Sequence, residues 1–202
     1  MIAIVDYGAG NLRSVRNALQ HLGAQVVTIS RPEQLQEADK IILPGVGAFG
    51  AGMAALREGG FVEPIQTLAR TGIPLLGICL GMQYLFESSE EMGQHQGLGL
   101  LKGHVRYFGE QAPLIPHIGW NQLHVQQEHP LLKGVESGSY AYFVHSYYVQ
   151  AANESDILAT TDYGIDYASV VGQGNIFGIQ CHPEKSQAVG LHILRNFVEW
   201  EP

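Results

Sequence analysis

IPLLGICLGMQYLFESS, residues 73–89, joins an apolar run to a cysteine that stands between two glycines. The run 73–78 predicts a buried strand, and residues 82–88 predict the start of a helix. A strand that turns directly into a helix brings the flanking backbone close together, so a Cβ at Gly77 or Gly81 would crowd the turn. Cys79 then stands where the nucleophile elbow of hydrolases carries serine. The alternative is that Cys79 is a buried structural thiol, the usual state of a lone cysteine.

Strand-like and helix-like segments alternate through the first half of the chain. Strands are predicted at residues 2–5, 25–29, 40–43 and 73–78, and helices at 11–22, 50–58 and 61–70. The second half holds shorter strand-like runs at 105–108, 121–125, 140–149, 157–161, 167–171 and 176–180, and then an amphipathic helix at 186–200. This alternation favours an α/β fold: an open, mostly parallel sheet flanked by helices and extended by antiparallel strands. We expect residues 1–202 to form one domain.

The composition narrows the class of partner. Of the 202 residues, 46% are hydrophobic and 15% are charged, and the formal net charge is -8. A chain this acidic shows no basic stripe that could replace the counterions of a nucleic acid, so we expect no nucleic-acid partner. No run approaches the roughly 18 apolar residues of a membrane span, and the N-terminus lacks a signal-peptide pattern, so no membrane partner is expected. With only two cysteines, the sequence favours a reducing compartment, the cytoplasm.

A second group of reactive residues follows the predicted strand 176–180. In CHPEK at 181–185, His182 and Glu184 are two residues apart in a segment that proline keeps extended, so their side chains point the same way. Glu184 would then orient the imidazole, and His182 would take the proton of Cys79. An ordinary surface turn is the alternative. Because the carboxyl ends of parallel strands meet at one edge of a sheet, we expect these residues to converge there.

The segment PGVG at residues 44–47 follows the third predicted strand, at the same edge. Acyl chemistry needs N–H donors where the tetrahedral oxyanion forms, and a glycine-flanked loop can turn a peptide N–H toward that point. The N–H of Leu80 is the natural second donor. The alternative is an ordinary Pro-Gly turn.

Other conspicuous residues favour a structural interpretation. Gly8 and Gly10 resemble the start of a dinucleotide fingerprint, but Arg13 occupies the position of the third glycine, so no nucleotide cofactor is expected. Cys181 is expected to pack inward. The histidines lack the close spacing of metal ligands, which argues against a metal site. They include His117, His124 and His145.

Taken together, PGVG, GICLGMQ and HPEKS resemble, in order and spacing, the motifs of the class I (triad) glutamine amidotransferases over nearly the whole chain. More narrowly, DYGAGN at 6–11, PGVGAFG at 44–50, HIGWN at 117–121 and YFVHSY at 142–147 are similar to the glutaminase subunits of imidazole glycerol phosphate synthases. The resemblance implies a flavodoxin-like form of the α/β fold. One departure is Cys181, where relatives often carry an aromatic residue; it changes the packing beside His182.

The resemblance implies a role for each site residue. Cys79 would be the nucleophile that attacks the side-chain amide carbon of L-glutamine, His182 the general acid and base, and Glu184 the residue that holds the imidazole. The oxyanion hole is implied at three backbone positions, Gly45, Val46 and Leu80. Contacts to the polar ends of glutamine are implied at Gly47, Gln83, Ser146 and Tyr147. No cofactor is implied.

In this family ammonia is passed on rather than released. The implied partner is a (βα)8-barrel synthase subunit, which joins the ammonia to a ribulose-phosphate intermediate in histidine biosynthesis. The positions that resemble the subunit contact are Asn11, Trp120, Tyr142 and Lys185. Three alternatives stay open: the glutaminase of another pathway such as vitamin B6 synthesis, a γ-glutamyl hydrolase, and a non-catalytic regulatory module. HIGWN and DYGAGN weigh against the first two, and the intact set of cysteine, histidine and glutamate weighs against the third.

Overall fold

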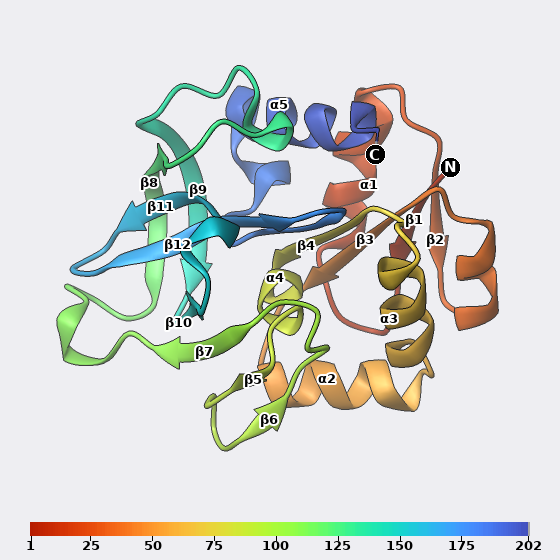
Figure 1. Ribbon diagram of the computed structural model, residues 1–202, viewed down its shortest axis with the longest axis horizontal. Helices are drawn as coiled ribbons and strands as arrows, with labels where there is room; N and C mark the ends of the chain where they lie inside the picture. The colour runs from red at the N-terminus through yellow and green to blue at the C-terminus, as the bar shows by residue number, and fades with distance from the viewer. Residues whose placement is uncertain (202) are drawn as a thin grey trace.

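Parallel strands form the centre of the fold (Figure 1). The structure is a computed structural model that describes residues 1–201. The parallel strands lie in the spatial order β2 (Val26–Ile29), β1 (Ile2–Val5), β3 (Lys40–Gly45), β4 (Leu75–Cys79) and β13 (Ile176–Ile179). Strands β1, β4 and β13 are buried along their whole length, as expected where helices cover both faces of a parallel sheet.

Mostly antiparallel strands extend this sheet beyond β13. The sheet continues through β12 (Asp166–Gln173), β10 (Tyr147–Ala151), β7 (Gly103–Tyr107) and the two-residue strands β5 (Ser88–Ser89) and β6 (His95–Gln96); the pair of β5 and β7 is parallel. A second branch leaves β12 through β11 (Ile157–Asp162) to β8 (His117–Val125) and β9 (Ser139–His145). The predicted α/β fold, with a mostly parallel central sheet and added antiparallel strands, is confirmed.

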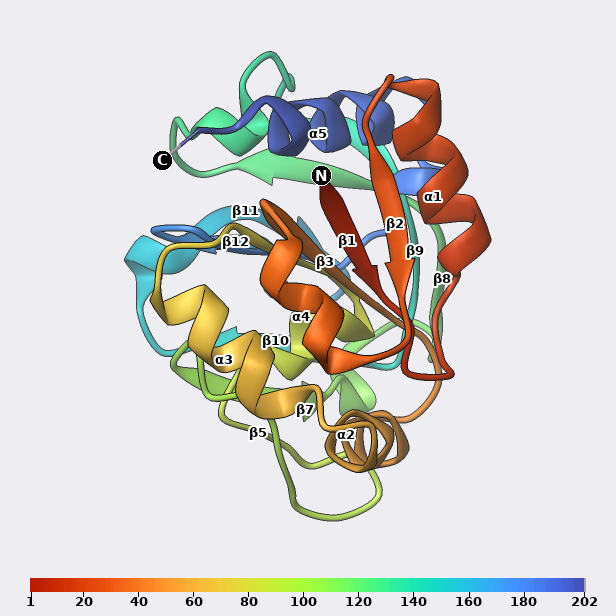
Figure 2. The ribbon, with the colours of Figure 1, turned by 90° about the vertical axis from the view of Figure 1, so that its right-hand side faces the viewer.

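Helices cover both faces of the parallel strands (Figures 1 and 2). Helices α1 (Leu12–His21) and α5 (Gln187–Glu199) lie on one face, and α2 (Phe49–Glu58) and α3 (Val62–Arg70) lie on the other. Alternate residues of β1 therefore enter different cores: Ile2 and Ile4 the first, Ala3 and Val5 the second. Short 3-10 helices occur at η1 (Pro32–Glu37), η2 (Gly109–Gln111), η3 (Pro130–Leu132), η4 (Glu154–Asp156) and η5 (Pro183–Lys185). Within residues 1–201, no helix has both the length and the apolar character needed to cross a membrane.

The segment after Cys79 differs from the helix predicted to begin at residues 82–88. Helix α4 begins at Leu80 and already ends at Tyr84. The carbonyls of residues 84, 85 and 86 accept hydrogen bonds from N–H groups of residues 98–101, which return along this segment. A continuing helix would need the same carbonyls for its own i→i−4 bonds. The prediction of a helix was therefore wrong beyond Tyr84, because residues 98–101 form hydrogen bonds with the carbonyl groups that a longer helix would use.

The predicted strand at 140–149 is also interrupted. Strand β9 ends at His145 and β10 begins at Tyr147, with Ser146 between them. Strand β9 pairs with β8, whereas β10 pairs with β7 and β12, so the two strands belong to different branches of the sheet. Both sides of the break are rich in aromatic and β-branched residues, which is why the sequence pattern does not reveal it.

Candidate active site

Cys79 is the last residue of β4 and directly precedes α4. Its backbone has φ 54° and ψ -112°, a conformation that residues with side chains rarely adopt. The flanking glycines are required for the steric reason expected. An added Cβ on Gly77 would lie 2.5 Å from the carbonyl oxygen of Gly81, and one on Gly81 would lie 1.8 Å from that of Leu43. The turn is therefore closely packed around the cysteine.

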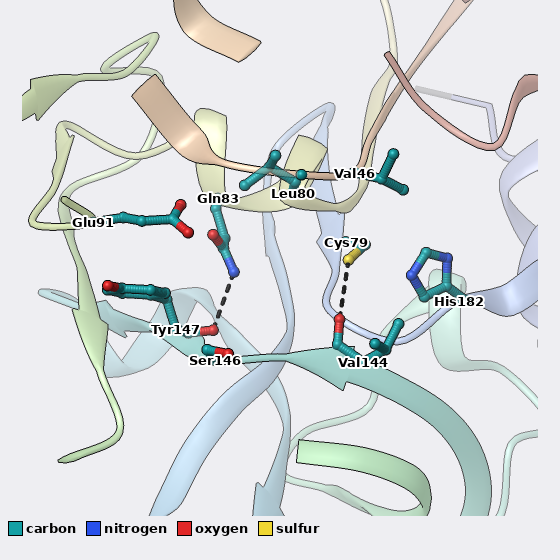
Figure 3. Close-up of a pocket in the computed structure, with 10 residues that line it drawn as sticks. Val46, Cys79, Leu80, Gln83, Glu91, Val144, Ser146, Tyr147 and His182 are labelled. Carbon is teal, nitrogen blue, oxygen red and sulfur yellow. Dashed lines mark hydrogen bonds between the residues drawn. The ribbon is translucent and has the colours of Figure 1, made fainter. Parts of the chain in front are cut away.

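His182 follows β13, the strand that lies beside β4 in the sheet. Its Nδ1 atom is 2.9 Å from Oε1 of Glu184, whose side chain is fully buried. The other ring nitrogen, Nε2, is buried and has no hydrogen-bond partner among residues 1–201. Figure 3 shows the imidazole beside the sulfur of Cys79. The structure thus brings the three predicted triad residues together, with the free ring nitrogen on the side of the sulfur.

The protonation of His182 depends on both neighbours. Burial by itself lowers the pKa of His182, but the Cys79 sulfur and the Glu184 carboxylate favour the imidazolium more strongly and raise this pKa to about 10. The sulfur has this effect although its contact with Nε2 does not have hydrogen-bond geometry. For Glu184, burial raises the pKa, but hydrogen bonds from His182 and Asn11 outweigh it, so that the pKa lies below its usual value. A protonated ring held between sulfur and carboxylate is favoured.

Neighbouring elements hold the His182 segment in place. The N–H of His182 donates to the carbonyl of Tyr142 over 2.8 Å, and the hydroxyl of Ser186 donates to the carbonyl of His182 over 2.7 Å. Asn11, which precedes α1, donates from Nδ2 to Oε1 of Glu184 over 3.0 Å. That oxygen also lies beside Nδ1 of His182, so it faces two donors. The predicted partner-contact residue Asn11 therefore lies against the carboxylate of the triad.

A pocket of about 170 Å³ opens beside Cys79 (Figure 3). Its lining includes the four predicted glutamine contacts, Gly47, Gln83, Ser146 and Tyr147. Gln83 is buried, and its Nε2 atom donates to the carbonyl of Tyr147 over 3.1 Å and to Oε1 of Gln180 over 3.0 Å. The side chain of Gln83 is thus tied to the pocket wall.

Two of the three predicted oxyanion positions, Val46 and Leu80, line the same pocket, and Gly45 precedes Val46 in the chain. Gly45 is the register partner of Cys79 across β3 and β4, and an added Cβ on Gly45 would lie 2.7 Å from the backbone nitrogen of Gly81. Val46, which follows, lines the pocket and is 42% exposed. Leu80 is the first residue of α4, so its N–H has no partner within the helix.

Comparison with known proteins gives the family. The model of the family described as "Glutamine amidotransferase class-I" matches residues 3–200. The chain belongs to the class I glutamine amidotransferases. The prediction that it is a glutamine amidotransferase is confirmed, and the enzyme class follows from the family.

Relatives of this amidotransferase share its whole length. It is 52% identical over 204 residues to the imidazole glycerol phosphate synthase subunit HisH of Sulfurimonas denitrificans, covering 99% of this chain and 98% of that one. Identity to the HisH subunit of Geobacter sulfurreducens is 49%, covering 98% of each chain. Among solved structures, PurLQS from Thermotoga maritima matches with a TM-score of 0.78 at 22% identity, covering 97% of this chain and 96% of that one. At this identity the structural likeness shows the fold alone.

The pocket of the amidotransferase also contains an acidic side chain that the sequence analysis did not single out. Glu91 lies toward the opposite end of the pocket from His182 (Figure 3). Its Oε2 atom accepts the N–H of Phe49, the first residue of α2, over 2.6 Å. In the sequence, Glu91 is one of several acids at 87–91 and belongs to no motif. Only the folding of the segment between β5 and β6 brings it to the pocket.

The other three predicted partner contacts form one surface cluster on the amidotransferase. Trp120 and Tyr142 are register partners on β8 and β9, and their ring centroids are 6.0 Å apart. The Nζ atom of Lys185 lies 5.8 Å from the centroid of the Tyr142 ring. Trp120 is 47% exposed, so much of its indole is available to a partner.

The second cysteine packs inward, as predicted. Cys181 is fully buried, and burial raises the pKa of its thiol far above the usual value. Neither cysteine forms a disulfide. Within residues 1–201, no group of three or more His, Cys, Asp or Glu side chains lies where it could hold a metal ion.

Proposed function

We propose that this chain is the glutaminase subunit of an imidazole glycerol phosphate synthase and hydrolyses L-glutamine to glutamate and ammonia. The observation that carries the proposal is the arrangement of Cys79, His182 and Glu184 beside the pocket that Gln83, Ser146 and Tyr147 help to line. The choice of pathway is supported by two HisH subunits of that synthase, which share about half of their residues with this chain over nearly its full length. The family match over residues 3–200 supports treating the chain as one glutaminase domain.

The reaction would proceed through a glutamyl thioester. The sulfur of Cys79 attacks the side-chain amide carbon of glutamine and forms a tetrahedral intermediate. His182, protonated in the resting pair, gives its Nε2 proton to the leaving nitrogen, so that ammonia departs as the C–N bond breaks. Water then attacks the thioester while His182 takes its proton, and glutamate leaves. Glu184 keeps the ring oriented and stabilises its charge throughout.

Backbone and pocket groups would bind the reacting amide and the rest of glutamine. The oxyanion is assigned to N–H groups of the Gly45–Val46 loop and of Leu80. Gly47, Gln83, Ser146 and Tyr147 are the proposed contacts for the polar ends of the substrate. The carboxylate of Glu91, at the far end of the pocket, suits the α-ammonium group.

The ammonia would pass to a (βα)8-barrel partner subunit, which would use it to form imidazole glycerol phosphate. We assign the contact to the surface cluster of Trp120, Tyr142 and Lys185, which offers an indole, a phenol and a cation. The unpaired cysteines suit a reducing compartment, so we place the complex in the cytoplasm.

The test is to replace each cysteine in the complex. Cys79→Ala should abolish glutamine-dependent synthesis and leave ammonia-dependent synthesis intact, because only the amide hydrolysis needs the sulfur. Cys181→Ala is the matched control, since that thiol is buried and has no role in the proposed reaction. If the Cys79→Ala variant still turns over glutamine, Cys79 is not the nucleophile.

A second measurement separates a partnered glutaminase from a free-standing hydrolase. We expect the isolated chain to turn over glutamine poorly. The complex with the barrel subunit should be far more active when the barrel has bound its own ligand, because we propose that the oxyanion loop rearranges on assembly. Full activity of the isolated chain would favour the free-standing hydrolase.

A further inference from the structure

Two buried histidines behind the pocket take no part in the triad. His117 on β8 and His145 on β9 are register partners and are 2% and 7% exposed. The Nδ1 atom of His117 is 3.2 Å from Nε2 of His145. The hydroxyl of Tyr167 lies 3.3 Å from Nδ1 of His117 and 3.2 Å from Nε2 of His145. Three polar atoms therefore meet in the interior, where an unpaired one would be costly.

The surroundings keep both rings neutral. Tyr163 and Phe143 stack on His117 with centroid distances of 3.8 and 5.0 Å. Burial lowers the pKa of His117 to about 4. Burial also lowers the pKa of His145, to about 3, and the nearby charge of His182 adds to this effect. At neutral pH each ring carries one proton, and the hydrogen bonds decide on which nitrogen it sits.

The proton of His145 sits on Nδ1. This atom is 2.7 Å from the carbonyl oxygen of Tyr147, which can only accept a hydrogen bond. The other nitrogen, Nε2, is then an acceptor for the Tyr167 hydroxyl or for His117.

The proton of His117 also sits on Nδ1, and the amide of Asn121 decides this. Asn121 Oδ1 accepts the backbone N–H of Gln122 over 2.8 Å, and Nδ2 donates to the carbonyl of Asp162 over 2.8 Å. These two partners set the orientation of the amide, so it is Nδ2 that faces Nε2 of His117 at 3.3 Å. Nε2 must accept there, which leaves Nδ1 of His117 as the donor toward His145 and Tyr167.

The donors thus run in one direction, from Asn121 through the two histidines to the carbonyl of Tyr147. That carbonyl also accepts from Nε2 of Gln83, as Figure 3 shows. Both Tyr147 and Gln83 line the substrate pocket. Strand β9 ends at His145 and β10 begins at Tyr147, so the imidazole bridges the break between the two strands.

We propose that His145 is a positioning residue for the glutamine pocket, held in one tautomer by the chain of Asn121, His117 and Tyr167. Its Nδ1–H fixes the carbonyl of Tyr147 and, through it, the amide of Gln83. It acts through these groups and does not touch the reacting atoms. The inference rests on the proposed function, because it concerns how that same pocket holds glutamine.

The first experiment compares two substitutions in the assembled synthase. His145→Phe keeps a ring of similar shape and removes the donor, and His145→Asn places an amide N–H near the position of Nδ1. We expect His145→Phe to raise the KM for glutamine about tenfold while kcat changes less than about threefold, since one hydrogen bond to the pocket wall is lost. His145→Asn should bring the KM back to within about threefold of the wild-type value.

Three controls separate the possible outcomes. Tyr148→Phe removes a hydroxyl from the same aromatic cluster and should leave the KM unchanged. Ammonia-dependent synthesis should be equal in all variants. If wild-type protein shows no glutamine-dependent synthesis, the proposed function fails. If the wild type is active and His145→Phe keeps its KM, or His145→Asn is as impaired as His145→Phe, only the positioning role fails.

A second measurement does not depend on whether the variants fold. In full-length protein labelled with ¹⁵N-histidine, nitrogen shifts should assign the Nδ1–H tautomer to both His117 and His145 at neutral pH. An Nε2–H tautomer of His145 would remove the donor to Tyr147 and overturn the proposal.

Discussion

The backbone of Cys79 has a positive φ of 54°, and the glycines around it let the chain take this conformation. Gly81 has the least room, because an added Cβ would lie 1.8 Å from the carbonyl oxygen of Leu43. That oxygen belongs to the backbone of β3 and cannot move without moving the strand. The geometry of the sulfur therefore depends on a residue that has no reactive group.

Gly81→Ala tests this dependence. We expect a loss of more than about 3 kcal/mol in the free energy of unfolding, measured by urea denaturation, because the backbone of β3 or α4 must shift. Gly99→Ala is the control: nothing lies within 4 Å of an added Cβ there, so the change adds no steric clash and meets only the positive φ of Gly99, 59°, which Gly81 does not share. That change should cost about 1–2 kcal/mol from backbone strain alone. Equal losses in the two variants would contradict the steric account.

Asn11, a predicted contact of the partner subunit, also makes a hydrogen bond within the candidate active site. Its amide donates to Oε1 of Glu184, and this hydrogen bond helps to keep the pKa of Glu184 below its usual value. A carboxylate with a lowered pKa stays ionised as the pH falls, and it is the ionised form that stabilises the imidazolium of His182.

Asn11→Ala should therefore lower glutamine-dependent kcat about three- to tenfold at neutral pH, the effect of losing one hydrogen bond to a charged group. Without this donor the pKa of Glu184 rises, so the acidic limb of the pH–rate profile should move to higher pH. Asn11→Asp should be more damaging, because it places a second negative charge beside Glu184. Subunit affinity, measured in parallel, separates this effect from a loss of docking. An unchanged pH profile in both variants would rule out the role.

At the scale of elements, β8 and β9 form a two-stranded surface with an exposed apolar side. Ile118, Trp120 and Tyr140 are 59%, 47% and 55% exposed. Tyr142 pairs with Trp120 across the strands, and Tyr140 lies opposite Gln122. Neighbouring side chains on one face of an antiparallel pair come from alternate positions, so these residues form one continuous patch. This patch is the surface that we propose for the contact with the barrel subunit.

Trp120→Ala should weaken the complex with the barrel subunit about 30-fold or more, the effect of removing a hot-spot aromatic residue worth about 2 kcal/mol, measured by titration calorimetry. The stability of the isolated chain should change by less than about 1 kcal/mol, because the indole is half exposed. Val27→Ala is the control: Val27 is 42% exposed but lies on β2, at the other edge of the sheet. A similar loss of affinity in both variants would argue against this patch as the contact.

For the whole molecule, the buried histidines connect stability to pH. His117 and His145 have folded-state pKa values lowered to about 4 and about 3, against about 6.5 in the unfolded chain. Between those values the unfolded chain binds more protons than the folded chain, so stability is fully present above about pH 6.5 and is lost as the pH falls.

We expect the free energy of unfolding to fall between pH 6.5 and pH 4, with each of these histidines adding a slope of up to about 1.4 kcal/mol per pH unit. His145→Asn should show a shallower slope, because it removes one of the titrating groups. Urea denaturation at a series of pH values measures both. A wild-type stability that does not change over this range would show that the rings are protonated in the fold.

Much of the fold and of the site could be predicted from local patterns. The apolar runs at 2–5 and 73–78, the helical stripe at 11–22 and the order of elements led to the parallel sheet. The motif around Cys79 and the nearby pair His182 and Glu184 indicated which residues converge, because strand ends of one parallel sheet share an edge. These features depend on residues close together in the chain. The extended segment expected at 181–185 was wrong: residues Pro183–Lys185 form the 3-10 helix η5, and this turn brings the carboxylate of Glu184 to the ring of His182.

The sequence by itself therefore determined the α/β class, the nucleophile turn and the candidate triad. Only the tertiary structure decided where α4 ends, that the strand at 140–149 breaks at Ser146, and that Glu91 enters the pocket. It also decided that Asn11 donates a hydrogen bond to Glu184, and that the rings of His117 and His145, 28 residues apart in the chain, contact each other through their nitrogen atoms. The physical reason is the same in each case: the deciding contacts join groups that are far apart in the sequence. A local sequence pattern cannot reveal such a contact, because only folding brings the two groups together.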